Sequence, residues 1–132
     1  MIVHRDLKLG NLLLGQNMDI KVGDFGLSAK LTYNGERRNS SCGTPNYMAP
    51  EQLDPFKGHS FEADIWALGV IIYYMVVGRS PFSENAKDIK HLHSNINDVL
   101  YTFPPDLKIS NECKDLISCL LQKKESNRIK VD

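Results

Sequence analysis

The sequence has few cysteines, no excess of charge of either sign and no long apolar run. Its three cysteines are odd in number and lack a Cys-x-x-Cys spacing, which disfavours a disulfide framework and a zinc site. Because 16 basic and 16 acidic residues balance, neither nucleic acid nor an anionic membrane is expected as a partner. The longest apolar run, Ile65 to Val77, is shorter than the roughly 18 residues of a membrane span. We therefore expect an intracellular chain with reduced cysteines.

The residues that are present suit one domain, since 42% of the 132 residues are apolar. Two short apolar segments, 12–14 and 20–22, are separated by a loop of turn-forming residues and predict a β-hairpin. The segment from Leu27 to Gly43 is polar, with a turn at Asn34 and Gly35, and is expected to be a mobile loop.

The rest of the chain predicts helices. One should run from an N-cap at Ser60 to Val77, be buried on nearly all sides and end at Gly78. A second is expected from a cap at Ser83 to about Ser94. A third should start at a Ser110 cap, and its apolar stripe would consist of Cys113, Leu116, Ile117, Leu120 and Leu121.

Three short strings follow one another in the chain. Residues 4–11 read His-Arg-Asp-Leu-Lys-Leu-Gly-Asn, residues 24–26 read Asp-Phe-Gly, and residues 49–51 read Ala-Pro-Glu. They resemble the catalytic loop, the metal loop and the anchor of eukaryotic protein kinases. Each string alone could arise by chance, but their order and the activation-segment-sized gap between the second and third identify the resemblance.

The resemblance covers the whole chain but only the later part of a kinase domain. The Gly-rich loop, the strand Lys and the helix Glu of a kinase would precede residue 4. The implied fold is α+β: a mainly helical C-terminal lobe with a short β-hairpin at the catalytic end, and no N-terminal lobe. We expect residues 1–132 to be one partial kinase domain that is inactive alone and binds ATP weakly.

The resemblance implies ATP and Mg²⁺ as cofactors and gives five side chains a role in phosphoryl transfer. Asp6 would accept or orient the proton of a substrate hydroxyl, and Lys8 would place a positive charge on the γ-phosphate. Asn11 and Asp24 would bind Mg²⁺ through their oxygens. Leu13 would lie under the adenine, although a plain core leucine is equally compatible with its position.

Residues around the catalytic loop indicate the acceptor and the regulation. Lys8 and the string Gly-Thr-Pro-Asn-Tyr at 43–47 resemble serine/threonine kinases, in which Thr44 would bond toward Asp6 and Lys8. Proteins with serine or threonine acceptors are therefore the expected substrates.

Arg5 stands directly before the catalytic Asp, as in kinases whose activation loop is ordered by phosphorylation. Ser40 is the candidate phosphate acceptor and Ser41 the alternative, which implies an upstream activating kinase as a partner. Arg37 and Arg38 are either solvated or a basic recognition site for that kinase.

Three residues have implied structural roles. Glu51 would pair with Arg128, and Asp64 would hold the backbone of the catalytic loop. The chain departs from the family just before Arg128, because residues 124 and 125 are Lys-Glu where the family often has Asp-Pro.

Residues 35–38, 42–47 and 57–69 together resemble the polo-like kinases. That resemblance implies a cell-cycle role and a cytoplasmic or nuclear location, including the centrosome or spindle. The alternative is a truncated, non-catalytic fragment that acts as a decoy for kinase partners. A pseudokinase is disfavoured because Asp6, Lys8, Asn11 and Asp24 are all present.

Overall fold

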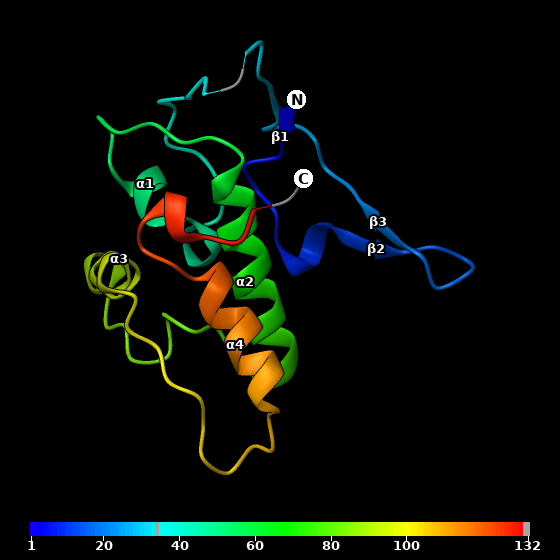
Figure 1. The fold of residues 1–132 in the computed structure, drawn as a ribbon, viewed down its shortest axis with the longest axis vertical. Helices are drawn as coiled ribbons and strands as arrows, with labels where there is room; N and C mark the ends of the chain where they lie inside the picture. The colour runs from blue at the N-terminus through cyan, green and yellow to red at the C-terminus, as the bar shows by residue number, and fades with distance from the viewer. Residues whose placement is uncertain (34, 131–132) are drawn as a thin grey trace.

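A computed structural model describes residues 1–33 and 35–130 of the chain (Figure 1). These residues form a mainly helical fold with a β-hairpin, as expected, and a second small antiparallel sheet. Figure 1 shows α4 lying alongside the central helix α2, and the β2–β3 hairpin projecting away from both. The helices are α1 (Pro50–Leu53), α2 (Glu62–Val77), α3 (Ile89–Asp98) and α4 (Asn111–Leu120).

The predicted hairpin is confirmed. Strand β2 (Leu12–Leu14) pairs with β3 (Ile20–Val22), with Leu13 opposite Lys21. A second pair, β1 (Ile2–Val3) with β4 (Ala29–Lys30), was not predicted, because strands of two residues are too short to show an alternating pattern. The hairpin strand β2 directly follows residues 4–11 and β3 leads into the Asp-Phe-Gly string, so the hairpin brings these two segments together.

The end of helix α2 was predicted correctly, but its start and its burial were not. It begins after Phe61, which caps it without a side-chain hydrogen bond, whereas the expected cap Ser60 lies one residue earlier. Gly78 ends the helix in the left-handed conformation, with φ +82°, that glycine adopts without strain. The expectation of burial on nearly all sides is wrong, since one face exposes Leu68 and Met75, the latter by 64%.

Helix α3 lies five residues further along than the sequence predicted. It covers Ile89–Asp98, and the carboxylate of Asp88 caps it by accepting a hydrogen bond from the His91 amide at 2.8 Å. Ser83 and Asp88 are both good capping residues, so the capping rule alone did not choose between them. Most of the residues from Ser83 to Lys87 form turns instead.

Helix α4 begins where it was predicted, because the Ser110 hydroxyl accepts a hydrogen bond from the Cys113 amide at 3.2 Å. Its apolar stripe is narrower than expected. Ile117 and Leu120 are buried, but Leu116 lies on the exposed side of the helix.

The core lies between α2, α3, α4 and the loop that follows α2. Trp66 of α2 stacks on Phe82 of that loop, with ring centroids 5.4 Å apart. Gly69 allows α4 to approach closely, since a Cβ there would lie 2.8 Å from Leu121 and 2.9 Å from Leu120. This packing fixes α2, whose first turn supports the candidate site.

Two expectations about the whole chain concern cysteine and membranes. All three cysteines, Cys42, Cys113 and Cys119, are free thiols. Within residues 1–33 and 35–130, no helix combines the length and apolar character needed to span a bilayer. The turn expected at Asn34 and Gly35 lies partly outside the described residues, because Asn34 is not among them.

Candidate active site

The first turn of α2 holds the backbone of the loop that carries Asp6. The carboxylate of Asp64 accepts hydrogen bonds from the His4 amide at 2.7 Å and from the Arg5 amide at 2.9 Å. Burial raises the pKa of Asp64, although these two bonds and the nearby charge of Arg5 favour its ionised form. Arg5 has a φ of +69°, a conformation that a residue with a Cβ rarely adopts and that the Asp64 bonds stabilise here.

Asp6 lies at the centre of a cluster with Lys8 and Thr44. One carboxylate oxygen accepts hydrogen bonds from the Thr44 amide at 2.8 Å and the Thr44 hydroxyl at 2.7 Å. The other oxygen accepts from the Lys8 ammonium at 2.7 Å, which also lies 3.0 Å from the Thr44 hydroxyl. The structure therefore brings these three predicted site residues together from segments 36 or more positions apart.

The charges of this cluster are set by its hydrogen bonds. Burial alone would raise the pKa of Asp6, but the bonds from Lys8 and Thr44 lower it below its ordinary value. The hydrogen bond with Asp6 raises the pKa of Lys8, and the charge of Asp24 contributes in the same direction. At neutral pH the site therefore holds a carboxylate and an ammonium in contact.

Asn11 and Asp24 come from the two ends of the hairpin. Asn11, at the end of a short 3-10 helix (Leu9–Asn11), donates a hydrogen bond from its side-chain nitrogen to the Asp6 carbonyl at 2.9 Å. The backbone carbonyl of Asn11 accepts a hydrogen bond from the Gly23 amide at 2.8 Å. This bond ties the loop before β2 to the loop after β3. Asp24 follows directly with a φ of +58°. These contacts tie Asn11, and the loop that leads into Asp24, to the loop that carries Asp6.

His4 is a contributor that the sequence analysis did not single out. Its ring Nε2 lies 2.9 Å from the Gly23 carbonyl, and its ring meets the edge of Phe25 at 4.9 Å between centroids. His4 thus connects the Asp6 loop with the Asp-Phe-Gly segment. Its place as the first residue of the string at 4–11 was the signal available in the sequence.

The structure places Ser40 against Arg5. Nη1 of Arg5 donates a hydrogen bond to the Ser40 hydroxyl at 2.6 Å, and its Nε donates to the Leu27 carbonyl. The idea that Arg37 and Arg38 are merely solvated is wrong, because both guanidinium groups donate hydrogen bonds to backbone carbonyls.

The Ala-Pro-Glu segment is anchored by a buried ion pair with Arg128, which lies beyond the end of α4. Arg128 donates hydrogen bonds to both carboxylate oxygens of Glu51, at 2.6 and 2.8 Å, and to the carbonyls of Glu62 and Gln122. The guanidinium also lies 5.1 Å from the centre of the Trp66 ring. The short helix α1, which follows Thr44, is thereby fixed to the core.

A comparison with family models matches residues 1–132 to the family described as the protein kinase domain. The chain belongs to the protein kinase family. The resemblance drawn from the three strings is confirmed, and so is the closer one to polo-like kinases, which curated relatives bear out.

Three relatives illustrate the similarity. A probable serine/threonine-protein kinase, CCRP1, of Zea mays is 47% identical over 131 residues, 99% of this chain and 21% of the relative. The probable serine/threonine-protein kinase PLK of Dictyostelium discoideum is 50% identical over 91% of this chain and 12% of its own length. The serine/threonine-protein kinase polo of Drosophila melanogaster is 45% identical over 96% and 21%. The chain therefore spans about a fifth or less of these relatives.

Protein kinases generally use ATP and Mg²⁺, and the oxygens near Asp6 fit such an ion. Asn11 offers an amide oxygen and Asp24 a carboxylate, and Mg²⁺ in phosphoryl-transfer sites takes few protein ligands and shares the rest with phosphates and water. Across residues 1–33 and 35–130, no three His, Cys, Asp or Glu side chains gather as a metal cage. The donor set suits an ion that arrives with a nucleotide.

Leu13 of β2 is not a core residue. Its side chain is 57% exposed, so the plain core interpretation is wrong. Gly23 lies beneath it, since a Cβ at Gly23 would be 3.3 Å from a Leu13 methyl group. The exposed side chain is available to an apolar ligand group above the hairpin.

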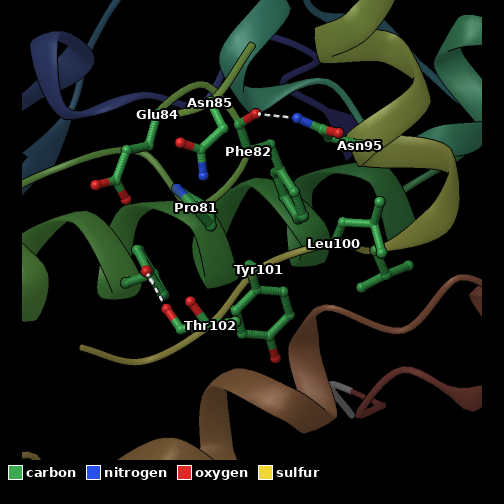
Figure 2. A pocket seen from close by; sticks show the side chains of 10 residues that line it. Pro81, Phe82, Glu84, Asn85, Asn95, Leu100, Tyr101 and Thr102 are labelled. Atoms are coloured by element: carbon green, nitrogen blue, oxygen red, sulfur yellow. Dashed lines mark hydrogen bonds between the residues drawn. The ribbon is translucent and has the colours of Figure 1, made fainter. Parts of the chain in front are cut away.

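A cavity of about 280 Å³ lies elsewhere in this kinase domain, between the end of α2, the loop after it, α3 and residues 99–102 (Figure 2). Asn95 donates a hydrogen bond to the Phe82 carbonyl at 2.9 Å along one wall. The charged side chain in its lining, Glu84, is paired with Arg79 at 2.7 Å. The cavity contains none of the residues around Asp6 and has no convergent acid–base pair.

Proposed function

We propose that this chain supplies the catalytic and metal-binding part of the active site of a serine/threonine protein kinase of polo-like type. The observation that carries the proposal is the Asp6 carboxylate held by Thr44 and Lys8, with the Asn11 side chain bonded to the Asp6 carbonyl and the charge of Asp24 acting on Lys8. In this assignment residues 1–132 form the C-terminal lobe of the kinase domain. Like its relatives, the protein would act in the cell cycle, in the cytoplasm or nucleus.

The proposed reaction transfers the γ-phosphoryl group of ATP to a serine or threonine hydroxyl. The hydroxyl oxygen bonds to the γ-phosphorus as the bond to the bridging oxygen of ADP breaks, and the hydroxyl proton passes to Asp6. The lowered pKa of Asp6 suits a group that orients the hydroxyl and takes its proton late, as a loose transition state requires. Mg²⁺ held by Asn11 and Asp24 would neutralise charge on the phosphates.

Lys8 and Thr44 have separate parts in this proposal. The Lys8 ammonium would face the transferring phosphoryl group and reduce its charge. Thr44 would fix the orientation of both Asp6 and Lys8 while the loop around it receives the substrate. Because Thr44 lies just after the polar segment with Ser40, ordering of that segment by an upstream kinase would control whether Asp6 is correctly oriented.

The test separates the proton acceptor from the metal ligand. Residues 1–132 are joined to the preceding part of the kinase domain of the Drosophila relative, and binding of ATP is measured by calorimetry with and without Mg²⁺. Asp6→Asn should leave the Kd within about twofold, because it keeps the metal ligands. Asp24→Asn should weaken binding about tenfold or more, a loss of about 1.4 kcal/mol, and only when Mg²⁺ is present.

Asp19→Asn is the matched control, since Asp19 is an exposed carboxylate of the same hairpin that pairs with Lys21 at 3.0 Å. It should bind as the unchanged protein does. Equal Kd values for Asp24→Asn and Asp19→Asn in Mg²⁺ would contradict the metal assignment.

A further inference from the structure

One arginine of the activation segment, the part of the chain between the Asp-Phe-Gly string at 24–26 and the Ala-Pro-Glu string at 49–51, makes more contacts than its surface position suggests. Arg37 donates hydrogen bonds to the carbonyls of Lys57 at 3.1 Å and Gly58 at 2.6 Å, and it forms an ion pair with Glu125. The second carboxylate oxygen of Glu125 lies 3.5 Å from the Lys57 ammonium. Glu125 therefore pairs with two positively charged side chains, Arg37 and Lys57, which precede it by 88 and 68 residues in the sequence.

The carboxylate of Glu125 is shielded, since its side chain is only 14% exposed, and it lies on a short 3-10 helix (Glu125–Asn127). An ion pair with a shielded, hydrogen-bonded partner is less weakened by solvent than a fully exposed pair. Glu125 also lies three residues before Arg128, whose contact with Glu51 fixes this part of the chain. The anchor point for Arg37 is thus rigid.

A backbone bridge next to Arg37 adds to the attachment. Arg38 and His59 exchange two backbone hydrogen bonds, with N···O distances of 2.8 and 2.9 Å. Ser40, two residues further on, accepts a hydrogen bond from Arg5. Arg37 and Arg38 are therefore held against the loop before α2, and Ser40 is held against Arg5.

The departure at residues 124 and 125 makes this attachment possible. A proline at position 125, as the family often has, offers no carboxylate to Arg37 or Lys57. One arginine of the pair at 37 and 38 is thus in contact with the glutamate of the Lys-Glu departure.

We propose that Arg37, Lys57 and Glu125 form a latch that holds the activation segment against the loop before α2 and, by occupying Arg37, slows phosphorylation of the exposed Ser40 by an upstream kinase. Arg37 and Arg38 precede Ser40 by three and two residues, a pattern that a basic-directed kinase can read. In the latched state the guanidinium of Arg37 is occupied by Glu125 and two carbonyls. The effect on Ser40 rests on the proposed function, whereas the latch itself does not.

The latch is tested on the 132-residue chain by hydrogen exchange of residues 36–42, whose Arg38 amide is bonded to His59. Glu125→Gln keeps the size of the side chain and removes its charge. It should speed exchange of this segment about two- to fivefold, which corresponds to loss of one partly shielded ion pair. Arg37→Ala should do the same, and the double variant should add little. Glu84→Gln, which breaks the exposed pair with Arg79, is the control and should leave residues 36–42 unchanged.

A measurement on the unchanged chain guards against misfolded variants. Raising NaCl from 0.1 to 1 M shortens the screening length from about 10 to about 3 Å. Exchange of residues 36–42 should increase with salt in the unchanged chain and much less in Glu125→Gln. Exchange that responds neither to Glu125→Gln nor to salt would overturn the latch.

Access to Ser40 is then measured directly. A basic-directed kinase that reads arginines two and three residues before its serine is added, and Ser40 phosphate is followed by mass spectrometry. Glu125→Gln should be phosphorylated about two- to fivefold faster than the unchanged chain, approaching the rate of a free peptide of residues 35–45. Equal rates would overturn the control of access. Neither readout uses phosphate transfer by this protein, so either failure leaves the proposed function untouched.

Discussion

Arg128 binds both carboxylate oxygens of Glu51, at 2.6 and 2.8 Å, although 77 residues separate them in the chain. Their side chains are 1% and 0% exposed, so the pair is entirely buried. A buried charge left without its partner is strongly destabilising, whereas the intact pair contributes little net stability. The folded state is therefore stable only when α1 and the segment after α4 are in contact, because either charge buried alone would be destabilising.

Removing one member of this pair should cost much more than removing an exposed pair. Arg128→Ala should lower the free energy of unfolding by about 3–5 kcal/mol, because Glu51 remains buried and uncompensated. Arg79→Ala, which breaks the exposed pair with Glu84, should cost no more than about 1 kcal/mol. Urea unfolding of both variants measures the difference. Similar losses of unfolding free energy in the two variants would show that the buried pair matters no more for stability than the exposed pair.

The contact of Glu51 with Arg128 was predicted from motifs. Other features of the structure, the position of α3 and the contacts of Glu125, could not be predicted in this way. Family strings place residues that share a chemical task, so Asp6, Lys8 and Thr44 could be expected to meet although they are distant in sequence. The position of α3 could not, since Ser83 and Asp88 are equivalent caps by local chemistry. The role of Glu125 could not either, because the sequence around Arg37 does not show which carboxylate it contacts, and that contact becomes visible only in three dimensions.

The hairpin and α4 show what local patterns can establish. Two apolar triplets around a turn predicted β2 and β3, and the Ser110 cap predicted the start of α4. The burial of α2 was overestimated. Apolar side chains on a helix face favour burial, but the sequence does not show whether another part of the chain packs against that face. Met75 and Leu68 are exposed for that reason. The β1–β4 pair joins residues about 27 positions apart and left no pattern at all.

His59 should make the stability of the chain depend on pH. It is buried, and burial together with the charges of Arg5 and Arg37 lowers its pKa, against the opposing charges of Glu51 and Glu125. A histidine with a lowered pKa binds fewer protons when folded, so stability rises with pH between the folded pKa and the unfolded value of about 6.5. The free energy of unfolding should therefore increase from pH 5 to pH 7, and His59→Gln should flatten this rise. An unchanged slope in the variant would assign the pH dependence to other groups.

Gly69 should not tolerate a larger residue, even though alanine favours helices. The added methyl group would lie 2.8 Å from Leu121 and 2.9 Å from Leu120, so α4 must move away. Overpacking of this kind costs about 1–3 kcal/mol, which exceeds the gain of about 1 kcal/mol in helix propensity. Thermal unfolding of Gly69→Ala should show a lower Tm. A higher Tm would mean that the helices separate more easily than the contact distances indicate.

Phosphoryl transfer by the joined protein described above tests the kinase assignment most directly. Phosphate transfer from ATP to a serine peptide is followed for the unchanged sequence, Asp6→Asn and the control Asp19→Asn. The account predicts phosphoserine formation that Asp19→Asn leaves intact and that Asp6→Asn reduces by about 10²-fold or more, as loss of a positioned proton acceptor does. Turnover by Asp6→Asn equal to that of the unchanged protein would contradict the assignment of Asp6 and with it the proposed active site.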